Sequence, residues 1–109
     1  YGLSNSTRGI IGGGQSAGSV YNTFTDFVVI ATTGGSNFFG NLTARANMNQ
    51  LSSAASSTRI VTMGGRNPSN SNEIDYGQIM TKGNFKDFGN LSSTATFMGG
   101  TSNGHGGLG

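Results

Sequence analysis

Short apolar runs, separated by glycine and small polar residues, set the pattern of this chain. In the second half, a strand is predicted over 74–80, with Ile74, Tyr76 and Gln78 on one face and Asp75, Gly77 and Ile79 on the other. A β-branched run at 59–63 ends at a glycine pair. With two weaker patterns, this half is predicted to form four short strands, at 48–54, 59–63, 74–80 and 86–91.

The first half shows a similar series, which predicts strands at 8–11, 25–32 and 38–42. Glycine, serine, threonine and asparagine together make up more than half of the 109 residues, and glycine alone accounts for 20. Such a composition has a poor summed helix propensity and excludes a helical bundle. Turn residues separate the predicted strands at Thr33-Gly34-Gly35, Asn67-Pro68-Ser69 and Lys82-Gly83-Asn84. We therefore expect an all-β fold.

The two halves are copies of one repeat. Two motifs recur at an offset of 51 residues, namely Ser6-Thr7-Arg8 with Ser57-Thr58-Arg59 and Gly13-Gly14 with Gly64-Gly65. Two more recur at an offset of 49, namely Asp26-Phe27 with Asp75-Tyr76 and Phe39-Gly40-Asn41-Leu42 with Phe88-Gly89-Asn90-Leu91. The change of offset places a two-residue deletion between the glycine pairs and the Asp-aromatic pairs. This stretch is 15–23 in one copy and 66–72 in the other, and both are polar, loop-like segments that tolerate a change of length.

The repeats divide the chain into repeat A at about 4–52, repeat B at about 53–101 and the start of a third repeat at 102–109. The chain opens at Tyr1 within the pattern, which indicates a processed or excerpted piece of a longer polypeptide. Four strands in about 49 residues is the period of a β-propeller blade, and it is long for one coil of a β-solenoid. The prediction is two four-stranded blades, part of a larger propeller or of an assembly of several chains. A β-solenoid is the alternative.

The pattern resembles kelch-type propeller repeats. The matching residues are Arg45, Gly64-Gly65, Tyr76 and Phe88-Gly89-Asn90-Leu91. Phe39 and Phe88 stand where kelch repeats have tryptophan, and Thr94 stands at the second-copy position of Arg45.

A closer resemblance is to the kelch-like repeats of structural proteins in tailed phages, marine and cyanobacterial ones in particular. The similar stretches are residues 7–14, 72–79 and 87–91, and the closing residues 102–108 look like that family's repeat junction. The resemblance implies a structural virion component on the particle surface, such as a tail fibre. It implies partners that are copies of the chain or further repeats of the same polypeptide. A host surface glycan is a further partner to be considered.

Two blades alone would leave two apolar faces uncovered, since propellers close with about four to eight blades. Because both chain ends lie at nearly the same phase of the repeat, head-to-tail assembly is expected, as a ring or a filament. Phe27, Tyr76, Phe39 and Phe88 are expected to pack between neighbouring blades.

The charges are few and give a formal net charge of +2. The six basic residues are scattered along the sequence, which does not favour nucleic-acid binding. No apolar run is long enough to span a bilayer as a helix. The chain has no cysteine, and its single histidine, His105, lies between glycines, so no metal, cofactor or catalytic site is predicted. We expect a protein that is not an enzyme.

Repeat-equivalent charges mark further structural positions. Asp26 matches Asp75, and Arg8 matches Arg59. The favoured interpretation is an ion pair between strands or blades, and the alternative is a ring of ligand-binding charges. The glycine pairs are expected to end strands with positive φ rather than to bind phosphate, since no Lys-Ser/Thr follows them.

Three aromatic residues break the repeat pattern, namely Phe24, Phe38 and Phe85. Polar or charged residues stand at the positions of their counterparts, for example Asp87 for Phe38, which suggests exposed sites. Exposed aromatic rings beside polar groups are typical of sugar-binding surfaces. These three residues are therefore the candidate ligand contacts of an alternative function, a carbohydrate- or receptor-binding propeller module.

Overall fold

The fold was described from a computed structural model, for residues 1–18, 20–43, 51–66 and 68–102. These residues form strands, turns and irregular segments and contain no helix. The strands are β1 (Gly2–Ser4), β2 (Arg8–Gly12), β3 (Gln15–Ser16), β4 (Val20–Tyr21), β5 (Phe24–Val29), β6 (Asn37–Asn41), β7 (Ser52–Ala55), β8 (Arg59–Met63), β9 (Ser71–Gln78) and β10 (Lys86–Ala95). The predicted all-β class is confirmed.

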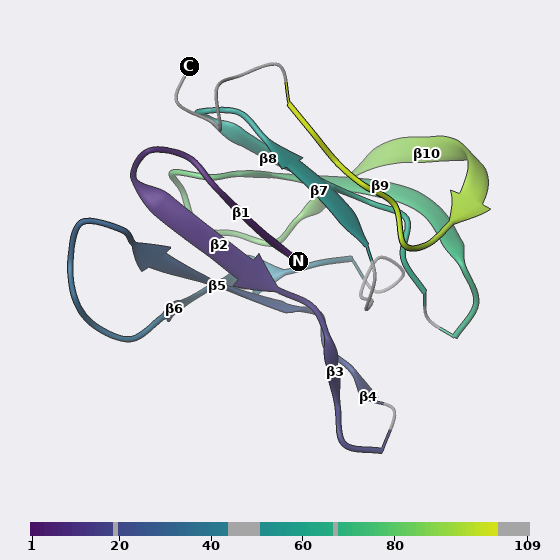
Figure 1. The fold of residues 1–109 in the computed structure, drawn as a ribbon, viewed down its shortest axis with the longest axis horizontal. Helices are drawn as coiled ribbons and strands as arrows, with labels where there is room; N and C mark the ends of the chain where they lie inside the picture. Colours follow the sequence, from purple (N-terminus) through teal and green to yellow (C-terminus); the bar gives the residue numbers. More distant parts are fainter. Residues whose placement is uncertain (19, 44–50, 67, 103–109) are drawn as a thin grey trace.

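Eight of these strands form two antiparallel sheets, as Figure 1 shows. The first sheet has the order β1-β2-β5-β6, and the second has the order β10-β9-β8-β7. Each sheet is built from one half of the chain, and every strand pair within it is antiparallel. Strand pairing therefore stays inside each repeat, and side-chain packing and a few hydrogen bonds join the two sheets.

The registers of the two sheets correspond residue by residue. Arg8 pairs with Val29 in the first sheet, and Arg59 pairs with Gln78 in the second, at the same repeat positions. A register shift interrupts the pairing of β5 with β6 after Thr25, and another interrupts the pairing of β9 with β10 after Asp87. The period-2 alternation of each strand thus places equivalent residues on equivalent faces.

The predicted strands are found, with shifted ends. The strand predicted at 25–32 ends earlier, at Val29, and the one predicted at 86–91 continues to Ala95. The first strand predicted in repeat B is shorter, and the part of it at 48–50 lies outside the described residues. Strand β1 was not predicted, because three residues at the chain end carry too little pattern.

The length difference between the repeats falls in a hairpin. Strands β3 and β4 pair with each other in the first repeat and project from the body of the molecule (Figure 1). The second repeat has a single bridge between Arg66 and Asn70 at this place. The two extra residues therefore lie where the chain turns back outside the sheets, in agreement with the predicted loop position.

A side-chain-capped turn starts β2 and β8 in the same way. The Asn5 carboxamide oxygen accepts the backbone N–H groups of Thr7 and Arg8, both at 2.8 Å. In the second repeat, the Ser56 hydroxyl accepts the N–H groups of Thr58 and Arg59, at 3.3 and 3.0 Å. Asn and Ser are turn formers because their side chains take up backbone donors in this way.

One core lies between the two sheets. Its buried apolar side chains come from both, namely Ile10, Phe27, Phe39 and Leu42 in or next to strands of the first sheet and Leu51, Ile60, Ile79 and Phe85 in or next to strands of the second. Because each sheet has only one face in this core, the other face of each sheet is turned outward. These two outward faces are where a binding function would lie.

Candidate functional site

Each sheet carries an arginine stacked on one ring of an aromatic pair. In the first sheet, the Arg8 guanidinium carbon lies 4.4 Å from the centroid of the Phe27 ring, and Phe27 packs edge-on against Phe39 at 6.3 Å between centroids. We call these three residues the first aromatic cluster. Three strands position them, since Arg8 comes from β2, Phe27 from β5 and Phe39 from β6.

The second sheet repeats this arrangement. Arg59 lies 5.1 Å from the Tyr76 ring centroid, and Tyr76 packs edge-on against Phe88 at 5.9 Å. We call Arg59, Tyr76 and Phe88 the second aromatic cluster. The interplanar angles of the two ring pairs, 75° and 77°, agree closely. The same side-chain geometry therefore forms twice within one chain.

The loop between β9 and β10 covers the first aromatic cluster. Phe85 packs against Phe39 at 6.0 Å between ring centroids, and the Lys82 ammonium lies 5.4 Å from the Phe27 ring. Arg8 donates a hydrogen bond to the Ile79 carbonyl oxygen at 3.1 Å. Residues 79–85 therefore form the cover, with apolar, cationic and backbone contacts together.

The same loop also extends the first sheet at its β6 edge. Gly83 N–H donates to the Phe39 carbonyl, and Phe85 N–H donates to the Asn41 carbonyl, at 3.0 and 2.8 Å. The Asn84 side-chain oxygen accepts the Asn41 N–H at 3.0 Å. A side chain at Gly40 would meet the Gly83 carbonyl, so this close approach requires glycine.

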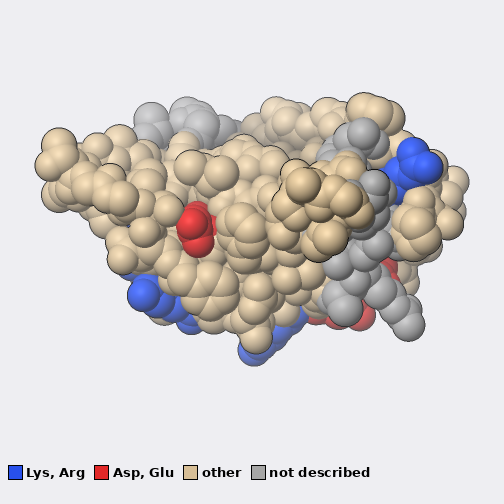
Figure 2. Space-filling model, turned by 90° about the horizontal axis from the view of Figure 1, so that it is seen from below, with Lys and Arg blue, Asp and Glu red and all other residues tan. Residues whose placement is uncertain are grey.

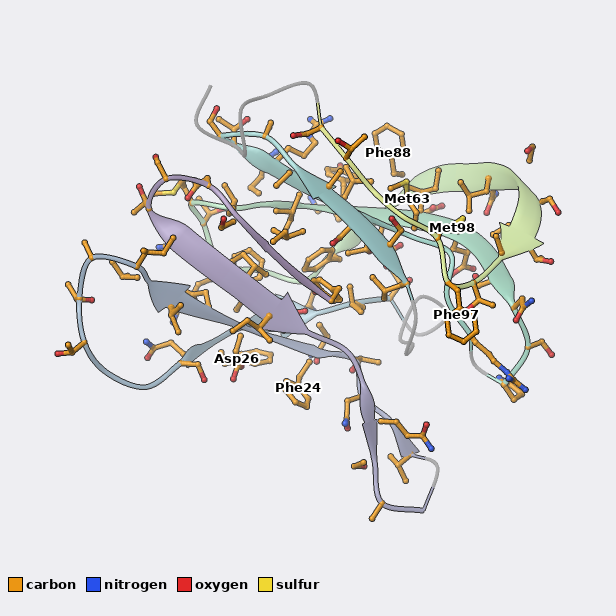
Figure 3. The ribbon with its side chains drawn as sticks, viewed as in Figure 1. Phe24, Asp26, Met63, Phe88, Phe97 and Met98 are labelled. Atoms are coloured by element: carbon orange, nitrogen blue, oxygen red, sulfur yellow. The ribbon has the colours of Figure 1, made fainter. Side chains whose placement is uncertain are left out.

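Within the part of the chain that the structure describes, no such loop covers the second aromatic cluster, which faces outward. The Phe88 side chain is 55% exposed, although Phe39 at the equivalent position is 2% exposed. Figure 3 shows Met63 and Met98 on the same side of the molecule as Phe88, with Phe97 close to Met98. Phe97 is exposed and has a φ of 55°, a conformation that non-glycine residues rarely adopt.

The outer face of the first sheet carries a second exposed apolar group, far from the second aromatic cluster. Ile11 and Phe38 flank Asp26 across three neighbouring strands, and both are more than half exposed. Phe24 lies two residues before Asp26 and is also exposed. Figure 3 shows Phe24 and Asp26 on the opposite side of the molecule from Phe88.

Asp26 and Asp75 have different partners despite their equivalence. Asp75 is buried between the sheets, and its carboxylate accepts the backbone N–H of Thr43 at 2.9 Å. Burial raises the pKa of Asp75 above its ordinary value, opposed in part by the Thr43 hydrogen bond. Asp26 instead accepts a hydrogen bond from the Ser36 hydroxyl at 2.8 Å, on the outer face.

These contacts correct the expected ion pairs. Arg8 and Arg59 stack on aromatic rings, and Asp75 binds a backbone donor of the other repeat. A carboxylate at a sheet interface is stabilised there by an N–H that would otherwise be left unpaired. That these positions are structural stays a prediction, and their contacts differ from those expected.

Two of the three predicted ligand-contacting aromatics are exposed. Phe24 and Phe38 lie on the outer face of the first sheet, 45% and 54% exposed. Phe85 is 4% exposed, so its predicted exposure is wrong. The physical reason is that Phe85 fills the interface between the two repeats, where it packs against Phe39. Its counterpart Ser36 is exposed on the outer side of the first repeat.

The glycine pairs end strands as predicted. Gly13, Gly14, Gly64 and Gly65 all have positive φ, between 68° and 99°. Gly13 N–H donates to the Phe24 carbonyl and Gly64 N–H donates to the equivalent Glu73 carbonyl, at 3.0 and 2.9 Å. These glycines are structural turn positions in both repeats.

Sequence reasoning missed the loop 79–85 and the role of Asn5. The Asn5 amide group donates hydrogen bonds to the Ser57 carbonyl and to the Met80 sulfur, which join the two repeats. The recurrence of a turn-forming side chain at the offset of 51 was a usable signal, since Ser56 is the counterpart of Asn5.

Charged side chains do not gather on the face shown in Figure 2, where most of the surface is uncharged. Within the described residues, no three histidine, cysteine or acidic side chains lie close enough together to hold a metal ion. His105 lies outside these residues. The same part of the chain contains no helix with the length and hydropathy needed to cross a membrane.

Comparison with protein-family models and with curated proteins gives no match to this chain.

Proposed function

We propose that this chain is a non-enzymatic structural repeat of a phage virion appendage, a tail fibre or another surface protein. In this proposal each four-stranded sheet is a kelch-like propeller blade, and the blades give rigid assembly and display. The virion assignment is supported by the resemblance of residues 7–14, 72–79 and 87–91 to tailed-phage repeats.

The observation that carries the proposal is the pairing of a covered aromatic cluster with an exposed copy of itself. A blade uses one face to cover the preceding blade and offers the other face to the next. The first and second aromatic clusters have this relationship, because only the first is covered by residues 79–85.

The strand pairing favours blades over the coils of a β-solenoid. In a solenoid each repeat contributes strands to sheets that run through neighbouring repeats. Here β1, β2, β5 and β6 pair only with one another in the first sheet, and the second sheet likewise uses its own four strands. Side-chain packing and the hydrogen bonds of the loop 79–85, rather than a strand shared between the two sheets, hold the two units together.

The virion assignment is tested on particles from the native source. Antibodies raised against the chain should label a surface appendage in electron micrographs, and peptides from 1–109 should occur in the mass spectrum of purified particles. Absence of both from particles whose other structural proteins are detected would refute the assignment.

A second candidate function, carbohydrate or receptor binding, is favoured by the outer face of the first sheet. Phe24 and Phe38 expose aromatic rings near the Asp26 carboxylate and the Ser36 hydroxyl. Sugars bind where an apolar ring lies beside directed polar groups.

A hollow in the second repeat adds to this candidate. Its volume is about 220 Å³, and it is lined by Tyr76, Gly77, Gln78, Thr81, Lys82, Gly83, Asn84 and Lys86. Binding on a glycan array that is lost in Phe24→Ala would support the outer face, whereas loss in Lys86→Ala would support the hollow. An array without any binder at high protein concentration would reject this function.

A further inference from the structure

Two faces meet inside the molecule, one from each sheet. The outward face of the second sheet is equivalent, by repeat position, to the inner face of the first sheet, and the outward face of the first sheet is equivalent to the inner face of the second. Ile10, Phe27 and Phe39 form the inner face of the first sheet, and all three are buried. Their counterparts in the second sheet are Val61, Tyr76 and Phe88. None of these three is fully buried, and we call them, with Arg59, the leading face.

For the other pair of equivalent faces, the copy in the second repeat is buried and the copy in the first repeat is exposed. Thr62 and Asp75 of the second sheet and Ile79, which follows β9, are each no more than 1% exposed, because the first repeat covers them. Their counterparts in the first repeat are Ile11, Asp26 and Ile30, which we call the trailing face. Ile11 and Ile30 are each 56% exposed.

We propose that the trailing face of a second copy of this chain docks on the leading face of the first copy. The contact would reproduce the interface that already joins the two sheets within one chain. Two complementary faces on opposite sides of one molecule make the association head-to-tail. This inference rests on the proposed structural function and names the partner and the residues of its assembly.

The internal interface specifies the hydrogen bonds of the proposed contact. As Arg8 donates to the Ile79 carbonyl, Arg59 would donate to the Ile30 carbonyl of the second copy. As Thr43 N–H donates to Asp75, Ser92 N–H would donate to Asp26 of the second copy. Both donors and both acceptors stand at matching repeat positions.

The free edge of the second sheet supplies the backbone part of the contact. Strand β10 is an edge strand, as β6 is in the first sheet. The loop 30–36 of the second copy is the counterpart of the loop 79–85 that pairs with β6. Gly34 and Gly83, at matching places in these loops, have φ values of 140° and 153°. An exposed strand edge with unpaired backbone groups favours such pairing.

A second copy fits better than an unrelated partner because the second aromatic cluster already has the geometry of the covered one. The covering loop differs in four places, since Ala31, Thr33, Gly35 and Ser36 replace Met80, Lys82, Asn84 and Phe85. The cover therefore loses an aromatic ring, an ammonium group, the carboxamide that accepts the β6 N–H and a thioether side chain. We expect the association between copies to be weaker than the internal one and to depend on protein concentration.

Sedimentation velocity over a range of chain concentrations tests the proposal with two variants. Phe88→Glu places a charge on the leading face, and Ile30→Glu places one on the trailing face. Both side chains are exposed, so the fold should be retained. Val20→Glu, which is equally exposed but lies on β4, is the matched control.

The wild-type chain and Val20→Glu should associate as concentration rises, whereas each of the other variants alone should remain monomeric. An equimolar mixture of Phe88→Glu and Ile30→Glu should form a 1:1 dimer and stop there, because one intact pair of faces remains. Self-association of Ile30→Glu alone would indicate that two leading faces pair and would overturn the head-to-tail arrangement. A wild-type chain that stays monomeric throughout would overturn the proposal.

Crosslinking gives an independent readout of the register. The chain has no cysteine, so Gly35→Cys and Asn90→Cys can be introduced together. They are the counterparts of Asn84 and Asn41, which hydrogen-bond in the internal interface. A short bis-maleimide should produce a ladder of multimers from the double variant and none beyond background from either single variant. Each single variant carries one thiol and can give at most a crosslinked dimer. Such a dimer above background would contradict the register.

These results separate the inference from the function. A monomeric chain whose antibodies still label virion appendages would reject the contact between copies and keep the structural role. A head-to-tail multimer that is absent from particles would reject the virion role and keep the contact.

Discussion

Phe39 and Phe88 occupy the same position in the two repeats, but their side chains are 2% and 55% exposed. Each ring packs edge-on against an aromatic ring of its own sheet, Phe27 or Tyr76, at nearly the same distance. The difference comes from the loop 79–85, which places Phe85 on Phe39. Both repeats thus form the same aromatic surface, and the loop 79–85 covers the copy in the first repeat.

Because only Phe39 is buried, replacing phenylalanine by alanine should destabilise the protein more at Phe39 than at Phe88. Phe39→Ala should lower the free energy of unfolding by about 3–5 kcal/mol, because it leaves a cavity in the core. Phe88→Ala should cost about 1 kcal/mol or less, since it removes an exposed ring. Urea denaturation of the monomer measures both. If Phe39→Ala does not fold, Phe39→Leu against Phe88→Leu makes the same comparison, and equal losses would contradict the assigned interface.

The two arginines should also differ. Arg8 stacks on Phe27 and donates to the Ile79 carbonyl, whereas Arg59 is exposed and stacks on Tyr76. Arg8→Met should therefore cost about 1–3 kcal/mol, and Arg59→Met less than about 1 kcal/mol, in the same denaturation experiment. If Arg59→Met lowers the free energy of unfolding as much as Arg8→Met does, the arginines stabilise mainly their own sheets rather than the interface between the repeats.

Gly40 should not tolerate a side chain. A methyl group there would meet the Gly83 carbonyl, which must move away from β6. Gly40→Ala is expected to lower stability by about 1–3 kcal/mol, seen as a reduced Tm. Gly35→Ala is the control, because its methyl group would meet open space and its φ lies outside the positive region. A similar Tm for both variants would place the 79–85 loop elsewhere.

Asp75 should give the stability a specific pH dependence. Because burial raises its pKa, the folded state holds the proton more tightly than the unfolded chain. The contribution of Asp75 to the free energy of unfolding is therefore greatest below about pH 4, where both states are protonated. It falls as the pH rises through the raised pKa.

Asp75→Asn should flatten this dependence. The amide oxygen can still accept the Thr43 N–H, but the group carries no charge at any pH. Between pH 4 and pH 7 the variant should lose less stability than the wild type, as measured by Tm at each pH. Asp26→Asn, at the equivalent outward position, should leave the wild-type slope in place. A steeper slope in Asp75→Asn would show that ionised Asp75 stabilises the interface.

Most of the strands could be predicted from the chain itself, because local pattern and turn residues decide them. The β-branched run at 59–63 and the glycine pair after it define β8 in the structure with the predicted bounds. Strand β1 and the β3–β4 hairpin could not be predicted, since their two or three residues are held by pairing partners rather than by their own pattern.

The candidate site was predicted only in part. Comparison of the repeats singled out Phe39, Phe88 and the two arginines, because they recur. It assigned the arginines to ion pairs, whereas they stack on rings. It also placed Phe85 at the surface, because a residue that breaks a repeat has no equivalent to reveal its partner.

The sequence by itself determined the all-β class, the two repeats and the residues that stand at equivalent positions. These depend on turn chemistry and side-chain alternation, which act over a few residues. Only the tertiary structure decided which copy of each equivalent pair is buried. The burial of Phe39 and the exposure of Phe88 depend on a loop about 40 residues away in the chain, and no local pattern encodes a contact at that separation.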